Sequence, residues 1–168
     1  MYMNIVIVGA EGMLGSMLAQ VFAEHKPLLL DREEIDITNE QSVRDTLRKA
    51  NASVIINAAA YTNVDAAEEN KQDAFLVNET GVKNLATVAK ELSATLVHFS
   101  TDYVFPGTSV DGYSETDSPG PAVNEYGNSK LAGERGLKES GCNFYLVRTA
   151  WLYGPAYAKA TAGKPNFV

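Results

Sequence analysis

Residues 4–22 open the chain with a pattern that few folds accommodate. A mostly β-branched run, Asn4 to Val8, leads directly into Gly9, Gly12 and Gly15, and apolar residues at helical spacing follow. The continuous apolar run is typical of a strand that is buried on both faces of a parallel sheet. A glycine turn between such a strand and a helix brings backbone N–H groups to the helix N-terminus, where a diphosphate binds. The pattern therefore predicts a dinucleotide site rather than an ordinary loop that happens to contain three glycines.

The glycines of this turn have different expected roles. Gly9 permits the tight turn, Gly12 lets a pyrophosphate approach the backbone, and Gly15 allows the helix to pack closely on the strand. Met13 and Leu14 stand at the start of the helix, so we expect them to contact the same cofactor.

The remaining chain alternates strand-like apolar runs with amphipathic helical stretches. This alternation predicts an α/β fold, a doubly wound parallel sheet of the Rossmann-like type. The expected strands are Pro27 to Leu30, Ser53 to Asn57, Thr95 to Phe99 and Asn143 to Val147, and the expected long helices are Asp73 to Leu92 and Glu125 to Ser140.

Polar residues after the second strand bear on the choice of cofactor. Asp31 lies about 20 residues beyond the glycine turn, where an acidic side chain accepts hydrogen bonds from the adenosine ribose. Arg32 follows it, and a guanidinium at this place can pair with the 2′-phosphate of NADP. The sequence thus leaves NADH and NADPH both open. Asp36 and Ile37 are expected to flank the adenine, although a plain helix-capping turn explains them equally well.

The carboxyl ends of the next two strands are also expected to face a ligand, as they do in open α/β sheets. Small residues after the third strand would let a cofactor ribose lie against the backbone, and Ser100 closes the fourth strand. The small residues are Ala58, Ala59 and Ala60.

Tyr126 and Lys130 stand four residues apart in a helical segment, so both side chains lie on one helix face. An ammonium beside a phenol stabilises the phenolate, which would allow Tyr126 to exchange a proton near neutral pH. Thr101, just after the fourth strand, could offer a hydroxyl to the same substrate oxygen. A chance pair is the alternative for this spacing, because the chain has eight tyrosines.

Three further residues are polar or reactive among apolar neighbours. His98 lies within an apolar strand and is expected to be structural. Asn78 is either a satisfied core amide or part of a proton relay behind the lysine. Cys142 is the only cysteine, so an internal disulfide is excluded, and a structural thiol in a reducing compartment is expected.

Charge and hydropathy exclude several classes of partner. The formal net charge is −7 and no basic cluster interrupts it, which argues against nucleic acid and against an anionic membrane surface. Apolar runs fall short of the ~18 residues that a membrane span needs, and the start of the chain lacks a signal-peptide pattern. We therefore expect a cytoplasmic protein.

Five short motifs follow one another along the chain. They are Gly9-x-x-Gly12-x-x-Gly15, Asn57 to Ala60, Ser100 to Phe105, Tyr126-x-x-x-Lys130-Leu131-x-Gly133-Glu134, and Arg148-Thr149-x-Trp151. In this combination the chain resembles the extended short-chain dehydrogenase/reductases, and within them the dTDP-4-dehydrorhamnose reductases (dTDP-L-rhamnose synthases). The resemblance extends over nearly the whole chain, to about Tyr153.

This resemblance implies a reaction and a set of roles. The family reduces the C4 ketone of a dTDP-linked 6-deoxy sugar with NADPH or NADH, the last step of dTDP-rhamnose biosynthesis, which serves cell-wall polysaccharides. Tyr126 would protonate the C4 oxygen as hydride arrives, and Lys130 would hold the nicotinamide ribose and lower the Tyr126 pKa. Thr101 would orient the carbonyl, while Asp102 and Trp151 match positions that line the sugar-nucleotide pocket.

The chain also departs from the family pattern. Family members are considerably longer, so we expect residues 1–154 to form the dinucleotide-binding domain and residues 155–168 to begin a substrate region that is mostly missing. Some members carry a glutamate that helps to hold a metal at a dimer contact, but Met17 occupies that position here, and no metal is expected. A homodimer stays open.

Two other functions fit part of the pattern. One is a non-catalytic dinucleotide-binding regulatory subunit, resembling the β subunit of methionine adenosyltransferase, which shares the D-Y-V-F and Tyr-Gly-x-x-Lys elements. The other is a sugar-nucleotide epimerase on the same scaffold, which would retain its cofactor tightly. The combination of Thr101, Tyr126, Lys130 and Trp151 favours the reductase.

Overall fold

The computed structural model describes residues 3–154 and contains one five-stranded sheet in which every neighbouring pair is parallel. The strand order is β2-β1-β3-β4-β5, so the chain starts inside the sheet, moves to one edge, and then returns across β1 to the other edge. This arrangement confirms the predicted parallel Rossmann-like sheet. The strands are β1 Ile5–Val8, β2 Leu28–Leu30, β3 Val54–Asn57, β4 Thr95–Thr101 and β5 Asn143–Thr149.

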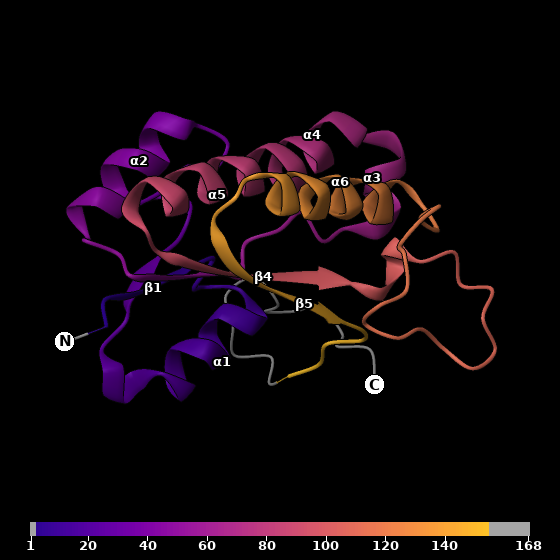
Figure 1. The fold of residues 1–168 in the computed structure, drawn as a ribbon, viewed down its shortest axis with the longest axis horizontal. Coiled ribbons are helices and arrows are strands. Elements are labelled where there is room, and N and C mark those ends of the chain that lie inside the picture. Colours follow the sequence, from indigo (N-terminus) through magenta and orange to yellow (C-terminus); the bar gives the residue numbers. More distant parts are fainter. Residues whose placement is uncertain (1–2, 155–168) are drawn as a thin grey trace.

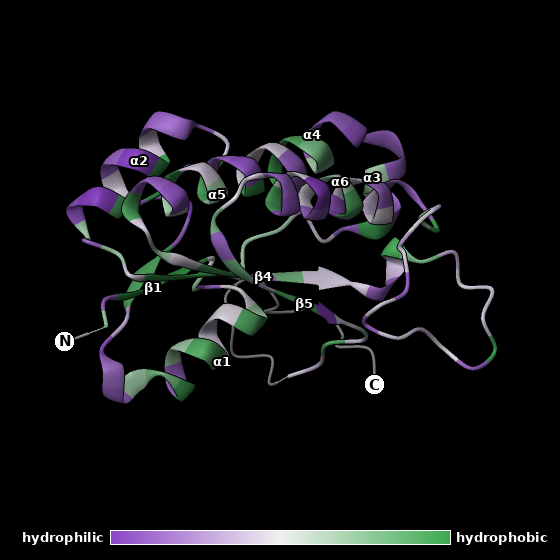
Figure 2. Ribbon diagram, in the orientation of Figure 1, coloured by the Kyte–Doolittle hydropathy of each residue, from purple (hydrophilic) through white to green (hydrophobic). Residues whose placement is uncertain are grey.

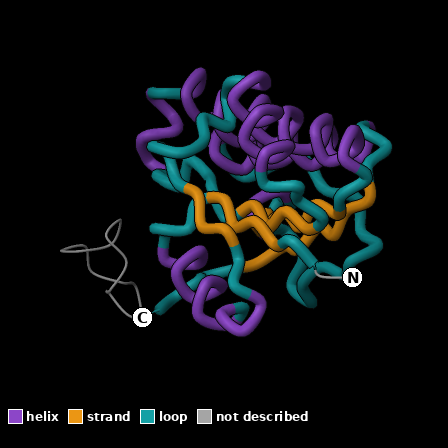
Figure 3. Tube along the Cα trace, turned by 90° about the vertical axis from the view of Figure 1, so that its left-hand side faces the viewer, coloured by secondary structure: helices purple, strands orange, loops and turns teal. Residues whose placement is uncertain are grey.

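Helices cover the sheet unequally on its two faces. Helix α1, Met13–Val21, lies on one face, while the other labelled helices form a layer on the opposite face (Figures 1 and 3). That layer contains α2 Glu40–Lys49, α3 Val64–Glu69, α4 Lys71–Phe75, α5 Gly81–Leu92 and α6 Glu125–Glu139. Short 3₁₀ turns at Ala23–His25 and Asp102–Val104 follow α1 and β4.

The single helix expected from Asp73 to Leu92 has a different form. Helix α4 passes into a π-helical turn, Leu76–Thr80, before α5 begins. Asn78 lies in this wider turn and bonds with both backbone groups of Tyr61. Periodicity of apolar residues could not reveal the extra residue of the turn, because the flanking helices keep the pattern of a buried face.

Every residue of β1 is apolar because the two faces of the strand lie in different cores. Val6 and Val8 join the larger core between the sheet and the helical layer, while Ile5 and Ile7 join a smaller core against which Leu18 of α1 packs. The strands therefore lie between two cores, and Figure 2 shows hydrophilic residues (purple) alternating with hydrophobic ones along the helices of the larger layer. A strand in this position needs an apolar side chain on each face.

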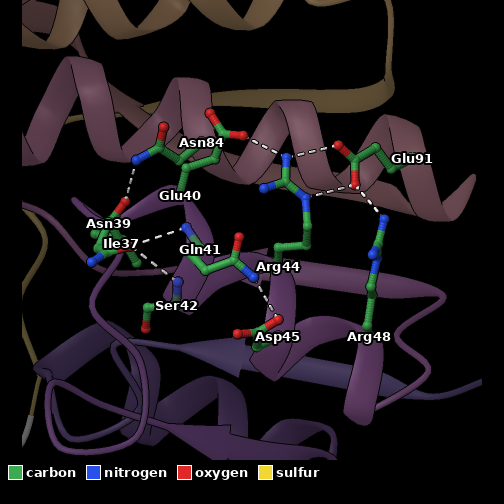
Figure 4. A network of polar contacts seen from close by, with 10 residues as sticks. All are labelled: Ile37, Asn39, Glu40, Gln41, Ser42, Arg44, Asp45, Arg48, Asn84 and Glu91. Carbon is green, nitrogen blue, oxygen red and sulfur yellow. Dashed lines mark hydrogen bonds and ion pairs between the residues drawn. The ribbon is translucent and has the colours of Figure 1, made fainter.

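Polar contacts fasten α2 to α5 beside the edge strand. Arg44 of α2 contacts Glu91 of α5 at 2.9 Å, and Arg48 reaches the same carboxylate at 3.0 Å (Figure 4). These ion pairs are partly exposed and contribute little individually. The buried amide of Asn84 is more specific, because it donates to the Ile37 carbonyl oxygen at 2.9 Å and so fixes the turn after β2.

The beginning of α2 contains a helix-capping turn, one of the two explanations left open for Asp36 and Ile37. Asn39 is the N-cap, and its side-chain oxygen accepts hydrogen bonds from the backbone N–H groups of Gln41 and Ser42 (Figure 4). Asp36 in turn accepts from the backbone N–H and hydroxyl of Thr38. Within residues 3–154, none of the helices is both long and apolar enough to cross a bilayer.

Candidate active-site cleft

A cleft of about 1040 Å³ opens at the carboxyl ends of the strands. It is formed by the glycine turn after β1, the ends of β2, β3 and β4, and one face of α6. Most of the residues predicted to bind cofactor or substrate line it, namely Gly9, Gly12, Met13, Leu14, Asp31, Arg32, Asp36, Ile37, Ala58, Ala59, Ala60, Ser100, Thr101, Tyr126, Lys130 and Trp151.

Two predicted residues lie outside this lining. Gly15 packs beneath the turn, where a methyl group would overlap the carbonyl oxygen of Gly9, so its role is helix packing, as expected from the pattern. Asp102 follows β4, and its carboxylate accepts a hydrogen bond from the Thr101 hydroxyl at 3.1 Å. It therefore lies beside the cleft and acts on one of the residues that lines it.

Gly9 has a conformation and surroundings that exclude a side chain. Its φ is +78°, a region that favours glycine, and an added Cβ would come within 2.6 Å of the backbone nitrogen of Ala59. The backbone N–H groups of Gly9 and Ala10 both donate to the Leu30 carbonyl oxygen, at 2.9 and 3.1 Å. The turn is thus held between the ends of β2 and β3, and Gly9 and Gly12 line the cleft.

Asp31 ties the end of β2 to the glycine turn. One carboxylate oxygen accepts from the backbone N–H of Glu11 at 2.9 Å, and the other accepts from the backbone N–H of Arg32 at 2.8 Å. The carboxylate therefore shapes the turn in addition to lining the cleft, and Arg32 lines the cleft next to it. Both residues that bear on the choice between NADH and NADPH thus lie in the same part of the cleft.

Thr101, Tyr126 and Lys130 line the same cleft, as the helical spacing and the strand end predicted. Tyr126 is half-buried and lies edge-on to Tyr103, with ring centroids 6.1 Å apart. Lys130 is buried, and its ammonium donates to the carbonyl oxygen of Phe99 in β4 at 2.6 Å. Side chains from α6 and β4 that carry a phenol, a hydroxyl and an ammonium therefore line one cleft.

The pKa of Tyr126 differs from what the resemblance implies. Burial raises the pKa of this phenol, and the nearby groups Asp102 and Tyr103 raise it further, while hydrogen bonding with the Thr101 side chain opposes them. The expected lowering by Lys130 does not occur in this structure, where the ammonium is bonded to the Phe99 carbonyl oxygen instead. Tyr126 therefore holds its proton at neutral pH and is suited to donate it.

Burial lowers the pKa of Lys130 from its ordinary value of 10.5 to about 8, although Glu134 opposes this. Since the folded-state pKa is below the unfolded-state value, the unfolded chain binds more protons between them, and stability rises with pH in that window. Between about pH 8 and about pH 10 we expect the free energy of unfolding of the parent chain to increase by about 2 kcal/mol more than that of a Lys130→Met variant.

Denaturant unfolding at several pH values would measure this difference. Lys49→Met, which removes an exposed ammonium on α2, is the matched control and should run parallel to the parent protein. A difference between the parent protein and Lys130→Met that stays constant over the whole range would contradict the lowered pKa.

A buried hydrogen-bond path joins the loop after β3 to the helix that carries Tyr126. Asn78 donates to the Tyr61 carbonyl oxygen at 3.0 Å and to the Ser129 hydroxyl at 2.9 Å, and Ser129 donates to the Tyr126 carbonyl oxygen at 2.7 Å. With Tyr61 N–H as a further donor to its side-chain oxygen, Asn78 is a satisfied core amide, one of the two readings left open. Ser129 was not predicted, although it directly precedes Lys130.

Glu134 and Arg148 form a second buried connection that the sequence analysis did not single out as functional. Arg148 of β5 donates twice to the Glu134 carboxylate of α6, at 2.9 and 2.7 Å, and its guanidinium lies 5.0 Å from the Phe105 ring centroid. Burial alone would raise the pKa of Glu134, but the hydrogen bonds and charge of Arg148, with the charge of Lys138, bring it below its ordinary value. The pair fixes α6 against the strand that follows it.

The cleft also contains residues that the sequence analysis did not propose. They are Val8, Glu11, Ile35, Thr38, Asn57, Thr62, Val77, Phe99, Thr149 and Leu152. Most are apolar or small and carry no chemical signal of their own. Glu11 and Asn57 are the polar exceptions, and Asn57 could have been found, because an amide that closes an apolar strand is unusual enough to mark a ligand-facing end.

Comparison with known proteins identifies the family. The family model described as "RmlD substrate binding domain" matches residues 3–167. The chain belongs to the dTDP-4-dehydrorhamnose reductase (RmlD) family. A dTDP-4-dehydrorhamnose reductase of Mycolicibacterium smegmatis is 44% identical over 155 residues, which cover 91% of this chain and 47% of that protein. The Salmonella typhimurium reductase is 41% identical and is matched over 98% of this chain and 54% of its own length.

Solved RmlD-family structures agree with this membership. A Bacillus anthracis dTDP-4-dehydrorhamnose reductase in complex with NADP superposes with a TM-score of 0.86 at 38% identity, covering 92% of this chain and 55% of that one. A Thermus thermophilus UDP-glucose 4-epimerase in complex with NAD has a TM-score of 0.80 at 23% identity, which shows a shared fold. The chain thus spans about half the length of the RmlD-family relatives that it matches.

Proposed function

We propose that the chain is the dinucleotide-binding and catalytic part of a reductase that converts dTDP-4-dehydro-6-deoxy-L-mannose to dTDP-L-rhamnose with NADPH or NADH. One observation carries the proposal: Thr101, Tyr126 and Lys130 line the same cleft as the glycine turn. The relatives named above as dTDP-4-dehydrorhamnose reductases, and the NADP in the Bacillus anthracis structure, support it.

The residues of the cleft fit a dinucleotide on physical grounds. Gly9 lets the turn pass close to the Ala59 backbone, where a side chain has no room, and Gly12 is the N-cap of α1. The N–H groups of the first turn of α1 would bind the diphosphate. Ala58 to Ala60 leave space for a ribose at the end of β3. A bound nicotinamide would supply the hydride that reduces the ketone.

The side chains then account for the proton and for orientation. As hydride adds to C4, Tyr126 gives its phenolic proton to the C4 oxygen, so that the ketone becomes an alcohol and the phenol a phenolate. Lys130, whose ammonium is bonded to the Phe99 carbonyl oxygen in this structure, lines the cleft where it would hold the nicotinamide ribose. The Thr101 hydroxyl donates to Asp102 in this structure, and it would turn its one proton to the carbonyl oxygen when substrate binds.

The division of the chain follows from the same proposal. Residues 1–154 form the dinucleotide-binding domain, and residues 155–168, which lie outside the described residues, begin the substrate region. Trp151 is 74% exposed at the edge of the cleft, so it is available to contact the sugar nucleotide. We further place the protein in the cytoplasm, where NADPH and nucleotide sugars are available, and the homodimer stays a prediction.

The test is consumption of NADPH in the presence of dTDP-4-dehydro-6-deoxy-L-mannose. It is made on this chain and on a chimera in which residues 1–154 replace the matching half of the Salmonella typhimurium relative. We expect turnover by the chimera and almost none by the chain alone, because the chain matches only 54% of that relative. A chimera that binds NADPH without turnover would defeat the reductase proposal in favour of a regulatory subunit, and tightly retained NAD would favour an epimerase.

Arg32 is expected to set the preference for NADPH. Its guanidinium lines the cleft beside Asp31, where it can form a charge-assisted hydrogen bond with the 2′-phosphate. We expect Arg32→Ala to weaken NADPH binding by about tenfold and to leave NADH binding within about twofold. Calorimetric titration with both cofactors measures the two affinities.

Arg135→Ala removes an exposed charge from α6 and serves as control. An equal loss for NADH and NADPH would show that Arg32 contacts a part that both cofactors share.

A further inference from the structure

His98 is a completely buried histidine in the middle of β4, and the mechanism above does not use it. It lies opposite Asn57 in the β3–β4 pairing, and its ring Nδ1 is 3.1 Å from the Asn57 side-chain nitrogen. The other end of the same amide, Asn57 Oδ1, accepts from the backbone N–H of Ala59 at 3.1 Å. Asn57 therefore bridges the buried histidine and the loop that lines the cleft.

The contacts of Asn57 determine which tautomer His98 adopts. Because the Asn57 oxygen accepts from Ala59, its nitrogen must donate to His98, and Nδ1 must then be the unprotonated acceptor. The imidazole is thus neutral, with its proton on Nε2. Burial, together with the nearby charge of Lys130, lowers the pKa of His98 well below its ordinary value and keeps it in this form.

The contacts from His98 through Asn57 end at Ala59, which lines the proposed cofactor cleft. Its backbone nitrogen would lie 2.6 Å from a Cβ on Gly9, so the end of β3 and the glycine turn leave no spare space between them. Ala58 is held from the other side, because its N–H donates to the Val8 carbonyl oxygen at 2.9 Å. A small shift of Ala59 would therefore change the place where a diphosphate meets the backbone.

We propose that His98 is a positioning residue for the dinucleotide cleft, which orients Asn57 and thereby fixes Ala59 against the glycine turn. The inference rests on the proposed function, since it requires that the cleft hold a nicotinamide dinucleotide. His98 touches neither cofactor nor substrate, and its contribution is to hold Asn57 in the one orientation that serves both partners. A histidine that merely filled the core would be replaceable by an apolar residue of similar size.

Two substitutions separate positioning from filling. His98→Leu keeps much of the volume and removes the acceptor, while His98→Asn retains a side-chain oxygen close to the place of Nδ1. We expect His98→Leu to weaken NADPH and NADH binding by about tenfold. We expect His98→Asn to bind both cofactors within about threefold of the parent chain. Cofactor fluorescence titration measures both, with circular dichroism confirming that each variant is folded at the temperature of the titration.

A double-mutant cycle tests whether the effect passes through Asn57. In an Asn57→Ala background, His98→Leu should weaken cofactor binding no further, because the amide that it orients is gone. Full additivity of the two losses would overturn the proposal. So would a folded His98→Leu variant that binds cofactor as tightly as the parent chain. A parent chain that binds neither cofactor would instead overturn the proposed function, and this inference with it.

Nitrogen NMR on the unsubstituted chain provides a measurement that does not depend on the folding of variants. The His98 ring should show a protonated Nε2 and an unprotonated Nδ1, unchanged across neutral and mildly acidic pH. A proton on Nδ1 would contradict the hydrogen bond from Asn57 and would overturn the proposed role.

Discussion

Tyr126→Phe in the chimera is expected to lower kcat for reduction of the dTDP-sugar by about 10³-fold. The substitution removes only the phenolic oxygen, so the half-buried ring and its edge-on contact with Tyr103 are retained. What is lost is the group that donates a proton to the C4 oxygen, which would otherwise have to accept one from water. Because burial raises the pKa of Tyr126, the parent phenol is protonated throughout the neutral range and is ready to donate.

The same change at an exposed position supplies the control. Tyr145→Phe on β5 removes a phenolic oxygen from a side chain that is 67% exposed and outside the cleft lining, and kcat should stay near that of the parent chimera. NADPH affinity should be nearly unchanged in the Tyr126 variant, which separates loss of proton transfer from loss of the cofactor site. Undiminished turnover by Tyr126→Phe would remove this residue from the chemical step.

Gly133→Ala is expected to destabilise the folded chain by about 3 kcal/mol, although alanine is the better helix former. A methyl group at Gly133 of α6 would overlap the carbonyl oxygen of Asn78, so α6 would have to move away from the π-helical turn. That movement would stretch the hydrogen bond between Asn78 and Ser129 and would shift Tyr126 and Lys130 with the helix. We therefore expect weaker cofactor binding together with lower stability.

Gly136→Ala on the same helix is the matched control, because a Cβ there meets only the flexible side chain of Lys83. The new methyl group would make the Lys83 side chain change its rotamer and would disturb its ion pair with Glu79, which costs less than moving backbone. The gain in helix propensity offsets this cost by up to about 1 kcal/mol. Guanidinium unfolding of both variants compares two identical chemical changes three residues apart. Equal free energies of unfolding for the two variants would show that the close approach of α6 to Asn78 does not contribute to stability.

The fold and most of the cleft were accessible from the sequence because their signals are local. The β-branched run of β1 is apolar on both faces since it lies between two cores, and Gly9 stands where only glycine can adopt the required φ. Tyr126 and Lys130 needed only the period of a helix to be placed on one face. Each of these features is determined within a few residues of chain.

The features that were missed depend on contacts between distant segments. Ser129 becomes meaningful only when Asn78, 51 residues earlier, is beside it, and Glu134 only when Arg148 is paired with it. His98 was correctly expected to lie in the core, but its bond to Asn57 depends on the register of β3 against β4. The sequence predicted a lowered pKa for Tyr126, because the spacing shows the neighbouring lysine. Burial of the phenol raises the pKa and is the larger effect, but burial is not visible in sequence spacing.

The seating of Gly9 against Ala59 divides the cleft into a part that tolerates redesign and a part that does not. Between these backbones even one methyl group has no room, so libraries that vary this half would mostly yield inactive proteins. In the turn after β2, Arg32 borders the same cleft from an exposed position, whereas Ile35 and Ile37 belong to the core. Directed evolution of coenzyme choice should therefore randomise Arg32 and leave the Gly9–Ala59 contact untouched.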